Sequence, residues 1–286
     1  MEGSQTIDDG VKARTRAEAF QTLSPLQNAL IGTAAGTIEV TILQPMLYCK
    51  NATQQKLGLS FDPRVLYRGL VMSVGNMAIL SALQFPLTNV ITAAITGGSP
   101  RKLSDIEMIA AGFGGGALSG IACCPMEGIM IQQQRFGQSL IATAGNMLRT
   151  YGAASFGRGM ITSVGREGLF TMGYMGVAPV ISQKIREDLP SVSPYQGKLL
   201  GAVGAGLIAA TLSHPLDTIK TCMQGDQQRA TYDSFSNTLS KLRSEGGLFR
   251  GWSWRTGRMI CAMFIMSECK ERLSPLFFPD HFDGTV

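Results

Sequence analysis

Charged residues at fixed distances from prolines are the part of this sequence best suited to chemistry. In the last third of the chain, Asp217 follows Pro215 by two residues and Lys220 follows it by five. An acid and a base at these positions lie one helical turn apart and project to nearly the same face. At membrane depth, such charges are costly unless they pair or line a wet cavity. Pairs that form and break can open and close a passage, so these residues suit a gate.

The same arrangement is partly filled at two earlier places. Glu127 follows Pro125 by two residues, and Lys50 follows Pro45 by five. Proline removes a backbone hydrogen bond and bends a helix. We therefore predict helix kinks at Pro45, Pro125 and Pro215, and a ring in which three bent helices bring acids and bases together.

An Arg-Gly pair recurs about every ninety residues and divides the chain into three similar parts. A glycine precedes each of the three prolines by nine residues, and a glutamine follows each by nine. A register held three times indicates an internal repeat. The copies of the pair are Arg68-Gly69, Arg158-Gly159 and Arg250-Gly251. We predict a polar N-terminal tail over 1–21, repeats over 22–103, 104–193 and 194–276, and a C-terminal tail over 277–286.

The composition favours helices packed in a membrane. Charged residues make up 16% of the chain and 34 of its 286 residues are glycine, a combination that suits close helix packing in lipid. The sequence predicts an all-α fold with six transmembrane helices in three helix hairpins. Short amphipathic helices are expected at the surface over 50–66, 135–157 and 221–249. The six candidate spans are 21–49, 69–100, 108–134, 159–183, 199–216 and 251–267.

Several other classes of function are disfavoured. The net charge of +5 is mild, and the basic residues neither cluster nor alternate with aromatics, which argues against nucleic acid. The six cysteines have no metal-ligand spacing and suit helix packing. The glycines around Gly112 imitate a dinucleotide loop but share the register of the repeat, so we interpret them as helix packing. We expect no enzyme, no catalytic residue, no metal and no cofactor. The N-terminus has no apolar signal-peptide core.

Longer motifs in the three repeats resemble the mitochondrial carrier family. The stretch from Pro215 to Lys220 is similar to the family signature P-x-[DE]-x-x-[KR], and Leu248-Phe249-Arg250-Gly251-Trp252 resembles its second half. The second repeat has the corresponding motifs Pro125-Met126-Glu127 and Phe156-Gly157-Arg158-Gly159. The resemblance spans about residues 22–276. It implies a multi-pass protein of the mitochondrial inner membrane, with the amphipathic helices on the matrix side.

The resemblance also implies which charges meet. The acid of each odd-numbered helix is expected to pair with the base of the next, so a matrix gate would join Glu127 to Lys220 and Asp217 to Lys50. The third pair would bring together Leu47 and Met130, the two positions that lack a charge. Losing both partners leaves an apolar contact at little cost, although coincidental drift at two sites is the alternative.

The family pattern includes a second gate at the opposite end of the helices, and this chain lacks most of its charged residues. The equivalent acidic positions hold Asn89, Pro179 and Glu271, and the expected bases do not follow them. The chain departs from the pattern at this end.

Substrate candidates lie between the two gates. Asn76, Arg166 and Arg258 occupy equivalent positions in the three repeats, and the resemblance makes them central contact points. Arg166 could grip a carboxylate with two hydrogen bonds, while Glu167 or Glu39 could hold an amine. The alternatives are a structural pair between helices for Arg166 and Glu167, and a partnership with a nearby arginine for Glu39.

The glycines of the Arg-Gly pairs are expected to begin the even-numbered helices. Free backbone N–H groups at such a start can bind an anion, and in this family they resemble sites for the cardiolipin headgroup. Gly69, Gly159 and Gly251 are therefore candidate lipid contacts. A tight turn explains the same glycines and is compatible with lipid binding.

Two functions follow from these observations. The first is a solute carrier that moves a small carboxylate- or amino-acid-like metabolite by alternating access, with that metabolite and cardiolipin as its partners. The second is a subunit of the same fold that has lost transport and is a structural component of a larger inner-membrane complex, for example a respiratory one.

Overall fold

The computed structural model describes residues 22–99, 101, 103–188 and 194–282, and the regular elements in this part of the chain are all helices. The calls for a tail over 1–21 and for the last residues, 283–286, lie outside it. We call the helices of the bundle the long helices: α2 (Pro25–Gln54), α4 (Leu70–Thr96), α5 (Asp105–Phe136), α7 (Met160–Thr171), α8 (Ala178–Asp188), α9 (Pro194–Gly225) and α11 (Trp252–Phe277), with α7 and α8 counted among them because they follow each other as parts of one longer helical segment. The short ones are α3 (Pro63–Leu66), α6 (Leu140–Tyr151) and α10 (Phe235–Ser244), with single turns at η1 (Ala153–Gly157) and η3 (Pro279–His281).

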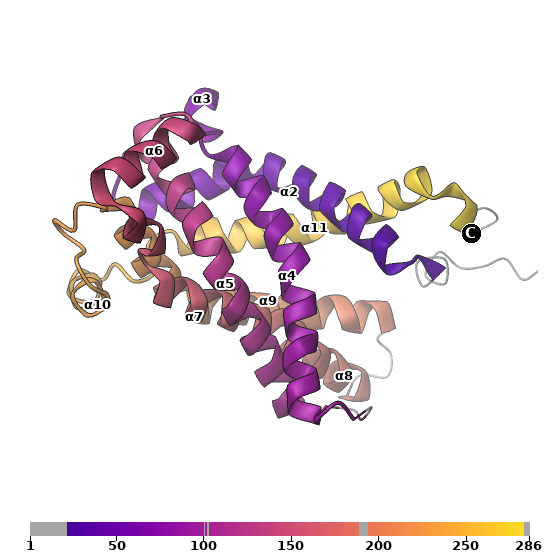
Figure 1. The fold of residues 1–286 in the computed structure, drawn as a ribbon. Helices are drawn as coiled ribbons and strands as arrows, with labels where there is room; N and C mark the ends of the chain where they lie inside the picture. Colours follow the sequence, from indigo (N-terminus) through magenta and orange to yellow (C-terminus); the bar gives the residue numbers. More distant parts are fainter. Residues whose placement is uncertain (1–21, 100, 102, 189–193, 283–286) are drawn as a thin grey trace, which may run out of the picture.

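The long helices form a closed ring in chain order. α2 packs on α4, α4 on α5, α5 on α7, α7 and α8 on α9, α9 on α11, and α11 returns to α2. Figure 1 shows α3, α6 and α10 together at one end of the bundle, while the long helices diverge toward the other. We call the first the gate end and the second the outer end. The all-α hairpin architecture expected from the sequence is confirmed, whereas the repeat boundaries stay a prediction.

The local sequence explains where the helices begin. Ser24 and Ser104 cap α2 and α5, and each forms a capping box with the side chain three residues on. Gly69, Gly159 and Gly251 stand at the N-caps of α4, α7 and α11. Each of these glycines has a positive φ between 77° and 81°, a conformation that L-residues adopt at a cost. The prediction that they begin the even-numbered helices is therefore confirmed.

The prolines of the repeats lie inside α2, α5 and α9, and the kinks expected there stay a prediction. One irregularity was not expected: the helix begun by α7 passes through a π-helical turn, η2 (Met172–Val177), before α8. Gly173 and Gly176 lie within this turn, where neighbouring helices leave no room for a Cβ.

The glycine run of α5 serves helix packing, as interpreted from the sequence. A Cβ on Gly116 would lie 2.4 Å from the backbone oxygen of Glu167, and one on Gly120 would lie 2.9 Å from Val164 Cα. α5 and α7 therefore approach each other backbone to backbone, which small residues permit. The run lies within a helix, so it is not a dinucleotide loop.

Three described stretches are long and apolar enough to cross a membrane by composition alone: Leu26–Gln54, Pro63–Thr96 and Asp105–Phe136. The predicted spans in the second half of the chain also fall on long helices. These carry more polar residues, such as His214, Arg255 and Arg258, inside the ring. Hydropathy alone therefore undercounts the helices that surround the interior.

The outer ends of α2 and α11 are joined by a histidine. The His281 Nδ1 atom lies 3.1 Å from Thr22 Oγ1, and its Nε2 atom lies 3.2 Å from Gln27 Nε2. Beside them, Phe282 packs in an apolar cluster with Leu23 and Ile31. The start of α2 and the end of α11 are thus held together.

Candidate functional site

A buried ion-pair network at the gate end joins the three proline-containing helices. Lys50 Nζ of α2 lies 2.7 Å from Asp217 Oδ2 of α9, and Lys220 Nζ of α9 lies 2.9 Å from Glu127 Oε1 of α5. All four side chains are less than a tenth exposed. These are the two pairs that the resemblance noted in the sequence implies. Their role as a gate stays a prediction.

Arg166 of α7 lies in the same network rather than apart from it. Its Nη2 atom is 2.6 Å from Glu127 Oε1 and also contacts Glu167, and its Nε atom is 3.7 Å from Asp217 Oδ1. The structure thus brings the predicted Arg166–Glu167 pair together with both acids of the gate. Arg166 has no freedom to bind a solute while these contacts hold.

Three further residues of the network were missed by sequence reasoning. Arg255 of α11 is buried, with Nη1 at 3.5 Å from Asp217 Oδ2, and its Nη2 donates to Ser213 Oγ at 2.7 Å. Gln54 Nε2 donates to Asp217 Oδ2 at 2.9 Å, and Ser163 Oγ donates to Glu127 Oε2 at 2.8 Å. The register of Gln54 and the charge of Arg255 inside a predicted span were the available signals. Ser163 carried none.

The third position of the ring is apolar. Met130 is buried, and a Cβ on Gly69 would lie 2.9 Å from its Cγ atom. Ser73 Oγ donates to Met130 Sδ at 3.0 Å. Met130 therefore packs against the start of α4, and its expected contact with Leu47 stays a prediction.

The other substrate candidates lie nearer the outer end. Arg258 Nη2 of α11 is 2.8 Å from Glu39 Oε1 of α2. The side chain of Glu39 is 5% exposed and that of Arg258 is 25% exposed. Asn76 of α4 has a buried Oδ1 atom, and Arg258 has a buried Nε atom, neither with a hydrogen-bond partner among the described residues. The structure pairs Glu39 with an arginine, which was the alternative considered for it.

The N-cap glycines adjoin the ring positions. A Cβ on Gly159 would lie 3.4 Å from Lys220 Cγ, and one on Gly251 would lie 3.1 Å from the backbone oxygen of Lys50. With Gly69 against Met130, each glycine thus touches the residue that follows a repeat proline by five positions. These residues are Met130 of α5, Lys220 of α9 and Lys50 of α2. The cardiolipin contacts predicted at these glycines remain a prediction.

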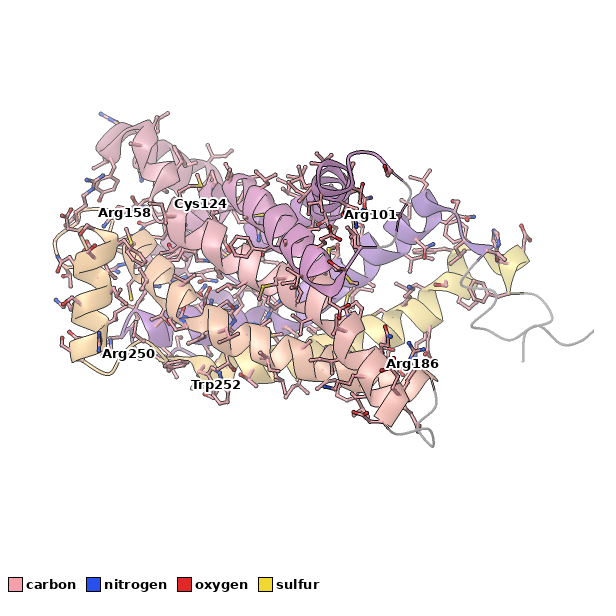
Figure 2. All side chains as sticks on the ribbon, turned by 90° about the horizontal axis from the view of Figure 1, so that it is seen from below. Arg101, Cys124, Arg158, Arg186, Arg250 and Trp252 are labelled. Atoms are coloured by element: carbon pink, nitrogen blue, oxygen red, sulfur yellow. The ribbon has the colours of Figure 1, made fainter. Side chains whose placement is uncertain are left out.

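The arginines of the Arg-Gly pairs act on neighbouring backbone and side chains. Arg158 Nε donates to the carbonyl oxygen of Met223 at 2.6 Å, near the end of α9. Arg250 Nη2 lies 3.0 Å from Glu245 Oε2, which also accepts from Lys56 Nζ at 2.8 Å. Figure 2 shows Arg158 and Arg250 at the gate end, with Arg101 and Arg186 away from it. Hydrogen bonds from Lys56 and Arg250 lower the pKa of Glu245 to about 2.

The outer end has a different character. Asn89, Pro179 and Glu271 are exposed. Between described residues there, the ion pairs are Arg272–Glu268 and Arg101–Glu107, and each lies within one helix or its capping turn. The described residues include no group of acidic, histidine and cysteine side chains that could hold a metal.

Comparisons with known proteins agree with this architecture. The family described as "Mitochondrial carrier protein" matches residues 191–281. A mitochondrial glycine transporter of Yarrowia lipolytica is 24% identical, over 80% of this chain and 88% of its own length. The mitochondrial tricarboxylate transporter 1 of Mycosarcoma maydis is 26% identical, over 88% of this chain and 95% of its own. The tricarboxylate transport protein of Saccharomyces cerevisiae is 25% identical, with the same shares covered. These relatives are transporters rather than enzymes.

Proposed function

We propose that this chain is a mitochondrial solute carrier of the mitochondrial carrier family and that it moves a small carboxylate- or amino-acid-like metabolite across the inner membrane by alternating access. The observation that carries this proposal is the buried network in which Lys50, Glu127, Asp217 and Lys220 join α2, α5 and α9 at the gate end. A barrier made of ion pairs can close that end and still open, because each charge can exchange its protein partner for water or a ligand.

The rest of the arrangement supports the same cycle. We propose that the network closes the gate end, and the long helices diverge toward the outer end (Figure 1). We propose that a solute enters from the outer end and meets Arg258, Glu39 and Asn76 before it reaches Arg166. Because Arg166 contacts both Glu127 and Asp217, a carboxylate that binds Arg166 would compete with the acids that hold the gate closed. Arg166 and Glu167 would then couple solute binding to gate opening.

The relatives bear on the class of solute. They include a glycine transporter and tricarboxylate transporters, so both an amino acid and a carboxylate belong to the range proposed for this chain. The N–H groups at Gly69, Gly159 and Gly251 are proposed contacts for cardiolipin, because helix starts attract phosphate.

Transport by purified protein in liposomes tests the proposal. The protein is reconstituted with cardiolipin, and uptake of radiolabelled amino acids, mono-, di- and tricarboxylates is followed with and without the same solute inside. Saturable uptake of at least one solute is expected, together with its loss in Asp217→Asn. Glu268→Gln, in an exposed pair of α11, is the matched control. Folded protein that moves no solute, and that co-purifies in fixed ratio with a large membrane complex, would overturn the carrier proposal in favour of the structural subunit.

A further inference from the structure

The charged side chains of the interior form two separate layers. We call the first the gate cluster: Lys50, Glu127, Arg166, Glu167, Asp217, Lys220 and Arg255, which are linked by contacts of 3.7 Å or less. The second layer is the Glu39–Arg258 pair, which joins α2 to α11. Arg258 follows Arg255 by three residues, so the pair lies about one helical turn farther along α11.

The formal charges of the two layers limit what the interior can hold. The gate cluster has four bases and three acids, which leaves one positive charge in excess, and the Glu39–Arg258 pair is neutral. A buried charge without a partner is costly. A solute with two or three negative charges would therefore have to break protein ion pairs and strand their acids to find enough cations.

The two layers also differ in how many protein ion pairs a solute must break in order to bind an arginine. A ligand that takes Arg166 disturbs contacts with three acids at once. A ligand that takes Arg258 breaks one ion pair, and the Arg258 side chain is the most exposed member of either layer. Arg258 Nε is a buried donor without a hydrogen-bond partner among the described residues, so this arginine can donate one more hydrogen bond. Asn76 Oδ1, on α4, is a buried acceptor that likewise has no partner among them.

Because the Glu39–Arg258 pair is neutral and contains the most exposed charge of the two layers, and resting on the proposed function, we infer that the solute is a small zwitterionic amino acid that inserts into this pair. Its carboxylate takes the place of Glu39 on the Arg258 guanidinium, and its ammonium takes the place of Arg258 on the Glu39 carboxylate. One ion pair is replaced by two, and no charge is stranded. A monocarboxylate would satisfy Arg258 but leave Glu39 alone, and a tricarboxylate would add two further unpaired charges.

Uptake and binding by paired variants test this inference. Glycine, alanine, lactate and citrate are offered to wild-type proteoliposomes and to Glu39→Gln, Arg258→Gln and Glu39→Asp. The wild type is expected to take up glycine or alanine, with lactate and citrate at least about tenfold slower. Glu39→Gln and Arg258→Gln should each lower amino-acid uptake by about tenfold or more, while Glu39→Asp retains most of it. Glu268→Gln is the control for reconstitution.

Binding measurements distinguish a variant that has lost the solute site from a variant that does not fold. Thermal unfolding of each variant in detergent reports folding, and the rise in melting temperature with glycine or alanine reports binding. The rise should be lost in Glu39→Gln while the unliganded protein still melts cooperatively. Citrate uptake by the wild type with inert amino acids would overturn the inference and leave the carrier function intact. Amino-acid uptake that is unchanged in Glu39→Gln would overturn it as well. A folded protein that moves none of the four and is not stabilised by them would also overturn it, and movement of any solute in the wider panel would then spare the carrier function.

Discussion

The three ring positions differ in the chemistry of their contacts: two are ion pairs and the third is apolar. Where α9 meets α2 and where α5 meets α9, the contact is an ion pair backed by further arginines and hydrogen bonds. At the third base position, on α5, Met130 packs on Gly69 and Ser73 of α4. A repeat can therefore keep its geometry while it exchanges charge for apolar packing. Charged junctions depend on every partner being present, whereas the apolar one depends on fit.

The largest effect is expected from Asp217, which contacts Lys50, Lys220 and Arg255 and accepts from Gln54. Asp217→Asn leaves several buried cations short of a partner, and we expect it to lower the free energy of unfolding by about 3–5 kcal/mol. Thermal or denaturant unfolding in detergent measures the change. Asp280→Asn, at an exposed position, is the control. A loss no larger than that of the control would mean that the network does not stabilise the folded protein.

The apolar junction can be converted into a charged one. Leu47→Glu alone should destabilise the protein by about 2.5–3.5 kcal/mol, because it adds a charge at membrane depth without a partner. Adding Met130→Lys should recover about 1–3 kcal/mol. The four proteins of this double-mutant cycle are compared by thermal unfolding. Strictly additive losses would show that the two side chains do not meet, and would contradict the pairing predicted from the sequence.

Alanine substitutions at two N-cap glycines separate the cost of a steric clash from the cost of backbone strain. Gly69→Ala and Gly159→Ala both place a Cβ at positive φ, which costs about 1–2 kcal/mol. At Gly69 the new atom would also lie 2.9 Å from Met130 Cγ, whereas at Gly159 the nearest atom is 3.4 Å away. We expect Gly69→Ala to be the more destabilising by about 1 kcal/mol or more. Equal losses in thermal unfolding would indicate that Met130 moves aside freely.

The smallest effect is expected at the exposed contacts of the gate end. Glu245 binds Lys56 and Arg250, and its pKa is lowered to about 2 from an ordinary value of 4.5. A lowered pKa means that the contact contributes fully above pH 4.5 and is lost as the pH falls toward 2. The melting temperature of the wild type should therefore exceed that of Glu245→Gln slightly at pH 6, and the difference should vanish near pH 2. A difference that persists in acid would assign the effect to packing.

The repeat register predicted much of this molecule. The recurrence of the Arg-Gly pair marked the helix starts at Gly69, Gly159 and Gly251. The resemblance to the carrier family implied the pairs of Glu127 with Lys220 and of Asp217 with Lys50. Periodicity succeeds here because each repeat solves the same packing problem, so equivalent residues meet equivalent neighbours.

Side-chain direction was harder to predict. Arg166 was expected to face a solute, yet its guanidinium turns toward the acids of the gate, because a long side chain reaches well beyond its own helical turn. Arg255 carried no assigned role, although it completes the shell around Asp217. The π-helical turn at Met172–Val177 depends on contacts of α5 and α9 with Gly173 and Gly176, which spacing within one helix does not encode.

The histidine that joins the outer ends of α2 and α11 has a polar contact on each of its ring nitrogens. Gln27 Oε1 accepts from the Ser24 backbone N–H at 2.7 Å, so the amide turns its NH₂ group toward His281 Nε2. An NH₂ group only donates, so Nε2 accepts in this contact. The Nδ1 atom faces Thr22 Oγ1. A single ring thus ties the first turn of α2 to the segment that follows α11, with one contact on each ring nitrogen.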